Sequence, residues 1–360
     1  MEATRLFRPL WSAMAAALLA SHAILAQAVE SIRVTAVAGH PPVLLWVKHL
    51  KETLIPTVDA ELAKGGKYKI QWTEGYAGSI AKVGEELEAI ESGLADIGHA
   101  WSLFDPAKLP LQNVGYVAPF NSDDSEMIAD IVELLQKKIP AMGAQWERYN
   151  QVYLGGAIAS DSYHLWTTFP IKRVEDVNGR KIGGPAPALN WLKGTGAVGV
   201  SSDLTRYYND IKSGVYDGAA LFVTSAFPQR LYEAAPHMTR VSFGTGFAGG
   251  ITFNKTKWAK LPQEVRSAIG AGVAAFKSAY YKEQSAREVA WMKAMQDKGM
   301  QVFTLPPEER RKWAKAVPNV AKEWAEAQEK KGLPGKAVLR GFMDELRSRG
   351  ANPPRDWDKE

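Results

Sequence analysis

The sequence predicts an α/β protein built from two lobes, with one long helix near the C-terminus that spans both. Two observations predict this class. Strand-like and helix-like segments alternate in two separate stretches of the chain, and a helical pattern of more than 30 residues, 263–298, follows them. Strand–helix–strand alternation is typical of a mostly parallel sheet with helices on its faces. Two such units followed by helices favour two lobes over a single barrel.

The first unit begins after residue 30 and contains three predicted strands and two predicted helices. The first helix is amphipathic, with Leu45, Leu50 and Leu54 among its apolar residues, and Gly93 ends the second helix. In chain order the elements are a strand at 32–37, a helix at 42–62, a strand at 68–72, a helix at 83–92 and a strand at 95–100.

The second unit repeats the pattern further along the chain. Its first strand follows Asn178-Gly179, and Ser201 or Ser202 is a plausible N-cap for its main helix. The elements are a strand at 181–182, a short helix at 188–193, a helix at 202–213 and strands at 216–220 and 248–253. From Pro262 to the end we expect almost only helix.

Composition excludes several classes of protein. The 360 residues are 46% hydrophobic and 23% charged, a mixture that is typical of a globular protein and excludes wholesale disorder. The absence of cysteine excludes disulfides, thiolate nucleophiles and cysteine-ligated zinc. The 44 basic residues are spread among 39 acidic ones, so we expect no nucleic-acid partner.

Residues 1–28 have the three parts of a secretory signal peptide. Arg5 and Arg8 precede an apolar run from Leu10 to Ala26, and the segment closes on Ala26-Gln27-Ala28, an A-x-A cleavage site. A transmembrane anchor is the alternative, but the run is rich in alanine and short for a bilayer. We therefore predict cleavage after Ala28 and a periplasmic protein.

The sequence contains no catalytic, cofactor-binding or metal-binding motif in the structural context that such a motif requires. GxGxxG occurs at 194–199 and at 244–249, but neither copy lies between a strand and a following helix, as dinucleotide binding needs. The six histidines never pair at metal-ligand spacing, and Asp123-Asp124 resembles a helix cap more than an acid/base pair. We expect no enzyme, no cofactor and no metal.

Four segments, in order and spacing, resemble the substrate-binding proteins of TRAP (tripartite ATP-independent periplasmic) transporters. The resemblance covers essentially the whole chain after residue 28. Its motifs are GLADIG at 93–98, EDVNGRKIGGP at 175–185, RYYNDIKSGVYDG at 206–218 and NKTKWAKLPQE at 254–264.

The resemblance implies a two-lobe periplasmic binding protein of the Venus-flytrap kind, with a cleft that closes around one small solute. It implies membrane permease subunits as partners, and we expect a monomer. The predicted division is a signal peptide at 1–28, lobe I at 29–160 plus 247–285, and lobe II at 161–246 plus 286–360. Closure requires that the solute gain affinity in the closed form.

The chain departs from the family where the family binds carboxylates. The family arginine that grips a carboxylate in a bidentate fashion corresponds to Gly183. A second basic position falls near Tyr163 or His164, an asparagine on Leu221 and an acidic residue on Trp101. The remaining candidate cations are Lys82 and Arg206.

These residues predict the solute and its site. We predict a small organic acid with an apolar or aromatic body, bound by Trp101, Tyr163, Leu221 and the position of Gly183. Lys82, Arg206 or backbone N–H groups would meet its charge. An uncharged ligand remains possible. Trp191 and Phe222 are candidates for either the cavity wall or the core. Trp46, Trp258, Trp313 and Trp324 are assigned to helix packing.

Three functions are alternatives to that of a TRAP receptor. The same receptor could serve a sensor kinase, which sequence cannot separate from a transporter. It could serve an ATP-driven transporter, whose hinge would usually lack the long helix at 263–298. A secreted hydrolase or transferase lacks a nucleophile–base pair in this sequence.

Overall fold

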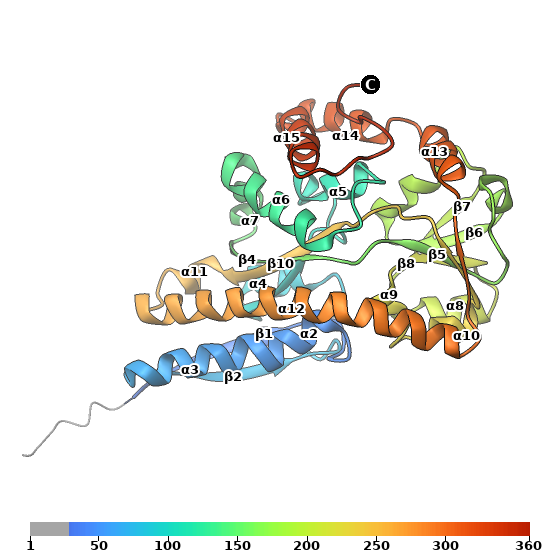
Figure 1. Ribbon diagram of the computed structural model, residues 1–360. Coiled ribbons are helices and arrows are strands. Elements are labelled where there is room, and N and C mark those ends of the chain that lie inside the picture. The colour runs from blue at the N-terminus through green and yellow to red at the C-terminus, as the bar shows by residue number, and fades with distance from the viewer. Residues whose placement is uncertain (1–28) are drawn as a thin grey trace, which may run out of the picture.

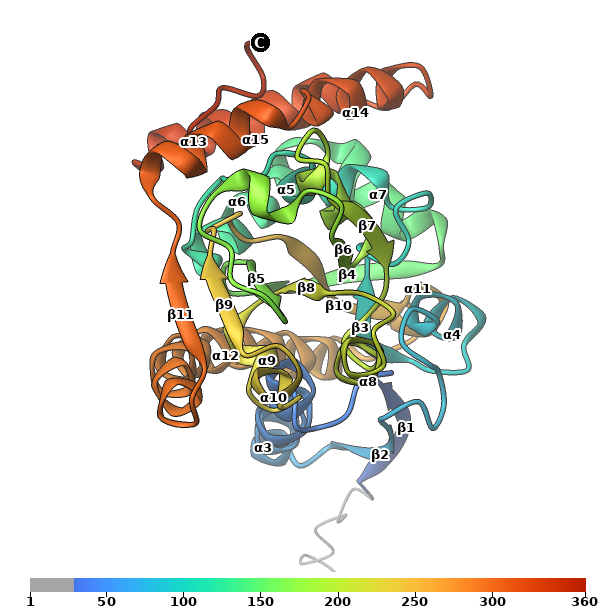
Figure 2. The ribbon, with the colours of Figure 1, turned by 90° about the vertical axis from the view of Figure 1, so that its right-hand side faces the viewer.

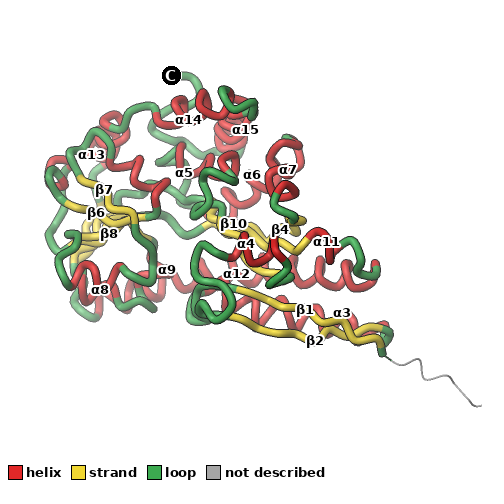
Figure 3. The backbone as a smooth tube through the Cα atoms, turned by 180° about the vertical axis from the view of Figure 1, so that it is seen from behind, coloured by secondary structure: helices red, strands yellow, loops and turns green. Residues whose placement is uncertain are grey.

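The computed structural model describes residues 29–360, and the predicted signal peptide at 1–28 lies outside them. The described chain forms two α/β lobes, each around its own sheet, with one long helix running along both (Figure 1). Figure 3 shows strands β1 and β2 at one end of the molecule and β6, β7 and β8 at the other. The predicted fold class is confirmed.

The first sheet has five strands. The core residues Val34, Ala36 and Ile97 are buried on strands that the alternating pattern predicted. In spatial order the strands are β2 (Tyr68–Gly75), β1 (Glu30–Val37), β3 (Ile97–Trp101), β10 (Phe247–Asn254) and β4 (Gln151–Ala159).

The second sheet has six strands. Its buried positions include Leu165, Ile182 and Ala219. In spatial order the strands are β11 (Gln301–Thr304), β9 (His237–Arg240), β5 (His164–Thr167), β8 (Gly218–Leu221), β6 (Lys181–Gly184) and β7 (Val198–Ser201).

Both sheets are mixed, but among the described strands of each sheet all except one run in the same direction, so the prediction of mostly parallel sheets is confirmed. Among the described strand pairs, β1 is parallel to β2 and β3, and β6 is parallel to β7 and β8. Strand β10 is antiparallel to β3 and β4, and β5 is antiparallel to β8 and β9. Strand β10 is thus the one reversed strand among those described in the first sheet, and β5 the one in the second. Each follows a crossing, so each enters its sheet from the other lobe.

Helices cover both sheets. The predicted helix at 42–62 forms with a π-helical turn in its middle, and Gly66, with a positive φ of 67°, ends it. The helices before the first crossing are α2 (Leu45–His49), η2 (Leu50–Leu54), α3 (Ile55–Gly65), α4 (Glu86–Ser92), η3 (Pro110–Asn113), α5 (Val114–Val117), α6 (Ser125–Lys138) and α7 (Pro140–Arg148).

The second lobe contains shorter helices. They are η4 (Val174–Val177), η5 (Ala186–Leu192), α8 (Tyr207–Lys212), α9 (Val223–Ala226) and α10 (Leu231–Ala234). The predicted helix at 188–193 is the 3₁₀ helix η5, and the predicted helix at 202–213 forms only as α8. The Ser201 or Ser202 cap was wrong, because Asp203 accepts hydrogen bonds from Thr205 and holds this stretch in a turn before α8 begins.

The chain passes between the lobes in two neighbouring connections, from β4 to β5 and from β9 to β10, which we call the crossings. The backbone N–H of Tyr163 donates to the carbonyl of Gly244 (3.0 Å), and that of Phe243 donates to the carbonyl of Tyr163 (3.1 Å). The side-chain amide of Asn121 donates to the carbonyl of Thr245 (3.0 Å). The connections β4 to β5 and β9 to β10 are therefore held together between the sheets.

The long helix α12 (Gln263–Asp297) confirms the predicted spanning element. Its middle is fixed at the first crossing, where Tyr281 Oη accepts from the N–H of Ala159 (3.0 Å) and Gln284 Nε2 donates to the carbonyl of Ala159 (3.0 Å). It packs on α2, α3 and β4 in one lobe and on α9 in the other (Figure 1).

The C-terminal region is helical except for one strand. Strand β11 pairs in parallel with β9, where we expected helix. The remaining helices are α11 (Lys255–Trp258), α13 (Pro307–Ala316), α14 (Val320–Glu329) and α15 (Gly335–Ser348). Helix α13 contacts η4, whereas α15 contacts α5 and α6 (Figure 2). The assignment of 286–360 to lobe II stays a prediction.

Candidate functional site

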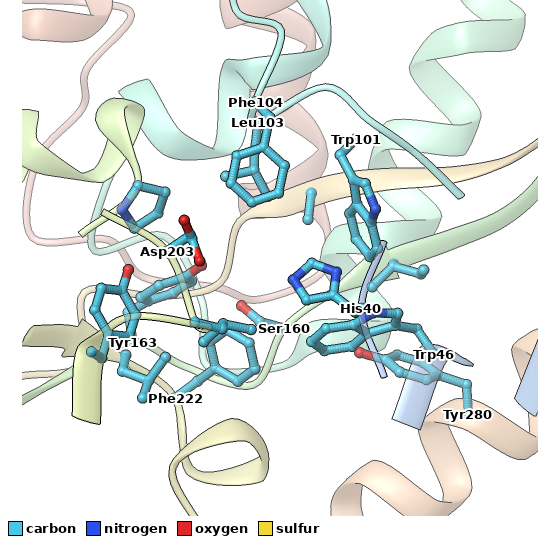
Figure 4. A pocket seen from close by; sticks show the side chains of 16 residues that line it. His40, Trp46, Trp101, Leu103, Phe104, Ser160, Tyr163, Asp203, Phe222 and Tyr280 are labelled. Atoms are coloured by element: carbon cyan, nitrogen blue, oxygen red, sulfur yellow. The ribbon is translucent and has the colours of Figure 1, made fainter. Parts of the chain in front are cut away.

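A cavity lies between the lobes, and its empty space, which includes space open to solvent, is about 500 Å³. Its wall is largely aromatic, and both lobes contribute to it (Figure 4). The lining residues are His40, Trp46, Trp101, Leu103, Phe104, Ile158, Ser160, Tyr163, Pro185, Asp203, Leu204, Tyr207, Leu221, Phe222, Ala248 and Tyr280.

The first lobe presents the ends of two parallel strands. His40 follows β1, and Trp101 is the last residue of β3, which is paired in parallel with β1. The carboxyl ends of parallel strands meet at one sheet edge, where ligands commonly bind. Trp46, at the start of α2, completes this wall, with its ring centroid 5.5 Å from that of Trp101 in an edge-on arrangement.

The second lobe presents the equivalent edge. Pro185 follows β6, and Leu221 is the last residue of β8, parallel to β6. Asp203 follows β7, and Tyr163 precedes β5 on the crossing. These residues therefore face the first lobe's wall across the cavity.

Aromatic contacts connect the two walls. The ring centroids of Trp46 and Phe222 are 6.5 Å apart, and Phe222 packs against Tyr163 at 5.2 Å. Edge-on and tilted pairs at these distances are favourable beyond the area that they bury. The cavity is thus bounded by rings whose positions depend on the approach of the lobes.

His40 is the one imidazole in the wall. It is 2% exposed, and neither ring nitrogen has a hydrogen-bond partner among the described residues. Burial lowers the pKa of His40 to about 4, although Asp203 opposes this shift. The ring is therefore neutral at pH 7 and offers one donor and one acceptor.

Glu86 lies behind Trp101. The Trp101 indole Nε1–H donates to Glu86 Oε1 (3.1 Å), and the backbone N–H groups of Gly39 (2.8 Å) and Gly84 (2.7 Å) donate to the same carboxyl. Burial raises the pKa of Glu86 to about 7 in spite of these three donors. The carboxyl orients the indole and ties it to the loop that carries His40.

Asp203 is the charged side chain of the wall. Its Oδ1 accepts from the backbone N–H (2.8 Å) and the hydroxyl (2.6 Å) of Thr205. Among residues 29–360 no Lys, Arg or His forms an ion pair with it. Ser160, also in the wall, has a buried hydroxyl that forms no hydrogen bond with any residue from 29 to 360.

The six residues predicted for the site separate into two groups. Trp101, Tyr163 and Leu221 line the cavity. Lys82, Arg206 and Gly183 do not line it.

The three outside residues lie in different surroundings. Lys82 is exposed in the loop before α4, and Arg206 is 60% exposed and pairs with Asp210 (3.3 Å). Gly183 is buried in β6, where an added Cβ would lie 2.9 Å from the ring of Tyr216. The two predicted cations are therefore exposed side chains outside the lining of the cavity, and their role as charge partners stays a prediction.

Other residues also have a defined place relative to the cavity. Trp46, assigned to helix packing, is buried on α2 and also lines the cavity. Phe222 lines the cavity, whereas Trp191 is core and donates its indole N–H to the carbonyl of Tyr116 (2.7 Å). His40 and Asp203 were not predicted as site residues, and their one usable signal is that each follows a predicted or observed strand by two or three residues.

Residues 29–360 show neither a metal site nor a membrane-spanning helix. No group of His, Cys, Asp and Glu side chains in this range is arranged to hold a metal ion. None of the helices in the same range has both the length and the apolar character that a membrane span needs.

Comparison with known proteins gives one family match. The family described as bacterial extracellular solute-binding protein, family 7, matches residues 56–328.

Solved structures with this fold hold different small acids. A TRAP solute-binding protein from a marine metagenome, specific for pyroglutamate, has 18% identity and a TM-score of 0.74 and covers 88% of this chain and 99% of its own. A marine metagenome relative with 3-hydroxybenzoate has 20% identity, a TM-score of 0.76 and coverage of 89% and 99%. The sugar acid binding protein of Advenella mimigardefordensis, in complex with galactonate, has 17% identity and a TM-score of 0.75 and covers 89% of this chain and 99% of its own.

Proposed function

The chain belongs to family 7 of the bacterial extracellular solute-binding proteins, the solute receptors of TRAP transporters, and from this premise we propose that the aromatic cavity between its lobes is the solute site. The role is binding and not catalysis. The observation that carries the proposal is the position of the cavity, where strand ends of both lobes meet. A solute there contacts both lobes only when they are close, so its binding favours the closed form.

We propose delivery of the solute to membrane permease subunits, as the family's name implies, and a monomeric receptor. A sensor kinase is the alternative partner. Copurification of the tagged chain with permease subunits from solubilised membranes, in the presence of solute, distinguishes the two. Copurification with a kinase instead would overturn the transport role and leave the receptor role intact.

We also propose export with cleavage after Ala28. The motivation is the Ala26-Gln27-Ala28 motif behind a basic and apolar segment. Mass spectrometry of the periplasmic protein should give a chain that begins at Val29. A full-length product in the membrane fraction would contradict it.

The body of the solute follows from the wall. Trp46, Trp101, Phe222 and the neighbouring rings offer flat apolar faces, so we propose a solute with an apolar or aromatic body. Each stacked aromatic pair contributes about 0.5–1.5 kcal/mol beyond the buried area.

The charge of the solute is a separate question. The sequence predicts a small organic acid, and the three relatives above bind organic acids. In this cavity a carboxylate would depend on the neutral His40, the hydroxyl of Ser160 and tyrosine hydroxyls, since Lys82 and Arg206 lie outside it. Organic acids therefore form one arm of the test.

The test is a thermal-shift screen of aromatic acids, dicarboxylates, sugar acids, amines and neutral solutes. At about 100 times Kd a solute adds about 2.7 kcal/mol of stability, which raises Tm by several degrees. Trp101→Ala should weaken binding at least about tenfold, or about 1.4 kcal/mol.

Trp324→Ala is the matched control, because Trp324 is on α14 and does not line the cavity. Equal affinity of the Trp101→Ala variant and the unaltered chain for a solute would show that the solute binds elsewhere.

A further inference from the structure

The residues that line the cavity carry no permanent positive charge. None of them is Lys or Arg, and Asp203 is the one acidic residue. The three relatives described above hold organic acids, which are anions at pH 7. A buried anion without a positive partner is costly. An organic acid in this cavity therefore needs a positive charge that arises when it binds.

His40 is the lining residue that can become positive. Its imidazole is 2% exposed, and neither ring nitrogen has a hydrogen-bond partner among residues 29–360. The ring centroid lies 5.2 Å from that of Trp46 and 5.5 Å from that of Trp101, both edge-on, and Figure 4 shows the imidazole between the two indoles. Packing thus holds the ring in the wall of the cavity, with both nitrogens unpaired.

Asp203 acts on His40 from the second lobe. Its carboxylate favours the protonated ring, whereas burial favours the neutral ring and lowers the pKa of His40 to about 4. A solute carboxylate beside the ring adds a second negative charge, which raises the pKa of His40 in the same direction as Asp203 does. Since the ordinary pKa of histidine lies near 6.5, such a shift brings protonation into the range of pH 5 to 7.

The other groups around His40 supply no cation to the wall. Strand β3 contributes His99, which burial keeps neutral with a pKa of about 3, and Lys82, in the loop before α4, has an exposed side chain. Glu86 on α4 and Asp161 on the first crossing are buried carboxyls, and burial raises the pKa of each to about 7. These two carboxyls are therefore alternative places for a proton. Helices α2 and α12 contribute the uncharged side chains of Trp46 and Tyr280.

We propose that the receptor binds its organic acid together with one proton from solvent, which protonates the ring of His40 and places an imidazolium beside the carboxylate of the solute. This inference rests on the proposed function, because it describes how the same site meets the charge of its solute. The acid anion and the proton are neutral as a pair, so the cavity gains no net charge. The hydrogen bond between them is charge-assisted, and the proton and the acid each raise the affinity for the other.

The experiment measures affinity and proton uptake with benzoate, 3-hydroxybenzoate, pyroglutamate and galactonate. Carboxyl groups of ordinary pKa stay mainly ionised at pH 5. Each acid that binds should therefore bind at least about fivefold more tightly at pH 5 than at pH 7. Calorimetry at pH 6 in two buffers of different ionisation enthalpy should show the uptake of about half a proton or more for each acid bound.

Variants assign the proton to one side chain. His40→Gln keeps a hydrogen-bonding group without a titratable ring and should abolish both the proton uptake and the pH dependence. His99→Gln is the matched control, because His99 is also a fully buried histidine without a partner among the described residues and does not line the cavity. It should keep both effects.

The carboxyl variants Glu86→Gln, Asp161→Asn and Asp203→Asn test the alternative holders of the proton. Each should keep the proton uptake. Loss of the uptake in one of them, with retention in His40→Gln, would assign the proton to that carboxyl and overturn the role of His40.

Histidine carbon-13 NMR of the unaltered chain gives the answer if a variant does not fold. Addition of the acid at pH 6 should convert one imidazole from the neutral to the protonated form, and an unchanged spectrum would overturn the inference. Acid binding that is independent of pH, or tighter at pH 7, would overturn the proton and leave the receptor site intact. Failure of these four acids and of every acid in the screen to bind would count against both this inference and an organic acid as the solute.

Discussion

At the residue scale, Gly183 occupies the position where the resemblance predicts a carboxylate-binding arginine. The ring of Tyr216 lies 2.9 Å from where a Cβ at Gly183 would be. Tyr216 is held there by hydrogen bonds to Ser202 (3.1 Å) and Asp210 (3.3 Å). A side chain at position 183 would therefore meet the ring of Tyr216, and Asp203 is the acidic residue among those that line the cavity.

His99 provides a pH-dependent prediction at the same scale. It is fully buried in β3, neither ring nitrogen has a partner among the described residues, and burial lowers its pKa to about 3. Below pH 6.5 His99 binds a proton in the unfolded chain but not in the folded chain. The free energy of unfolding therefore decreases as the pH falls from 6.5 toward 3. Between pH 6.5 and 5 this amounts to about 2 kcal/mol.

The variant His99→Leu should lose less stability over this pH range, because leucine binds no proton. Urea unfolding at pH 6.5 and pH 5 measures the difference for each chain. An equal loss in the variant and the unaltered chain would show that His99 does not titrate on unfolding as its burial requires.

At the element scale, the edge of the first sheet positions the cavity wall. Strands β1 and β3 pair at Ala36 with Ile97 and at Val37 with Gly98, and their ends carry His40 and Trp101. A Cβ on Gly98 would lie 2.4 Å from the carbonyl oxygen of Val37. The absence of a side chain at Gly98 is what lets the two strands approach.

Gly98→Ala should therefore force the two strand ends apart. We expect a loss of about 1–3 kcal/mol of stability, as for other overpacked sites, and weaker solute binding. Urea unfolding and calorimetry measure the two effects.

Gly143→Ala is the control for the same substitution. Gly143 lies in α7 with nothing within 4 Å of an added Cβ, so alanine should stabilise the chain by about 0.5–1 kcal/mol. If Gly98→Ala behaved like Gly143→Ala, the close approach of β1 and β3 would not limit the sheet.

At the scale of the whole molecule, two crossings and α12 connect the lobes, so closure changes the distance between them. The chain has no cysteine, and introduced cysteines therefore carry spin labels selectively. Leu94 and Val215 are exposed (61% and 46%) in the predicted lobes I and II. Labels at Leu94→Cys and Val215→Cys should approach each other when a solute is added.

A second label pair tests the division of the chain. Arg340 is exposed on α15, which contacts α5 and α6 as well as α14, although residues 286–360 are predicted to belong to lobe II. A distance between labels at Leu94 and Arg340 that stays constant on closure would assign α15 to lobe I. A distance that shortens with the Leu94–Val215 pair would confirm the predicted division.

Local patterns were sufficient for much of this protein. The strand–helix alternation predicted the α/β class, the helical pattern at 263–298 predicted α12 within one residue, and four motifs predicted the family. Each of these signals is contained in a short stretch of chain, because hydrophobic periodicity and capping act over a few residues.

The tertiary structure decided which side chains meet in the cavity and which strands run antiparallel. His40, Trp101 and Asp203 come from strand ends far apart in sequence, and only the pairing of β1 with β3 and of β6 with β7 and β8 brings those ends to the cavity. The crossings between lobes set the direction of β5 and β10, the strands that follow them. These outcomes depend on contacts between distant segments, which no local pattern contains, and for that reason the sequence predicted a receptor but not that His40 and Asp203 would line its cavity.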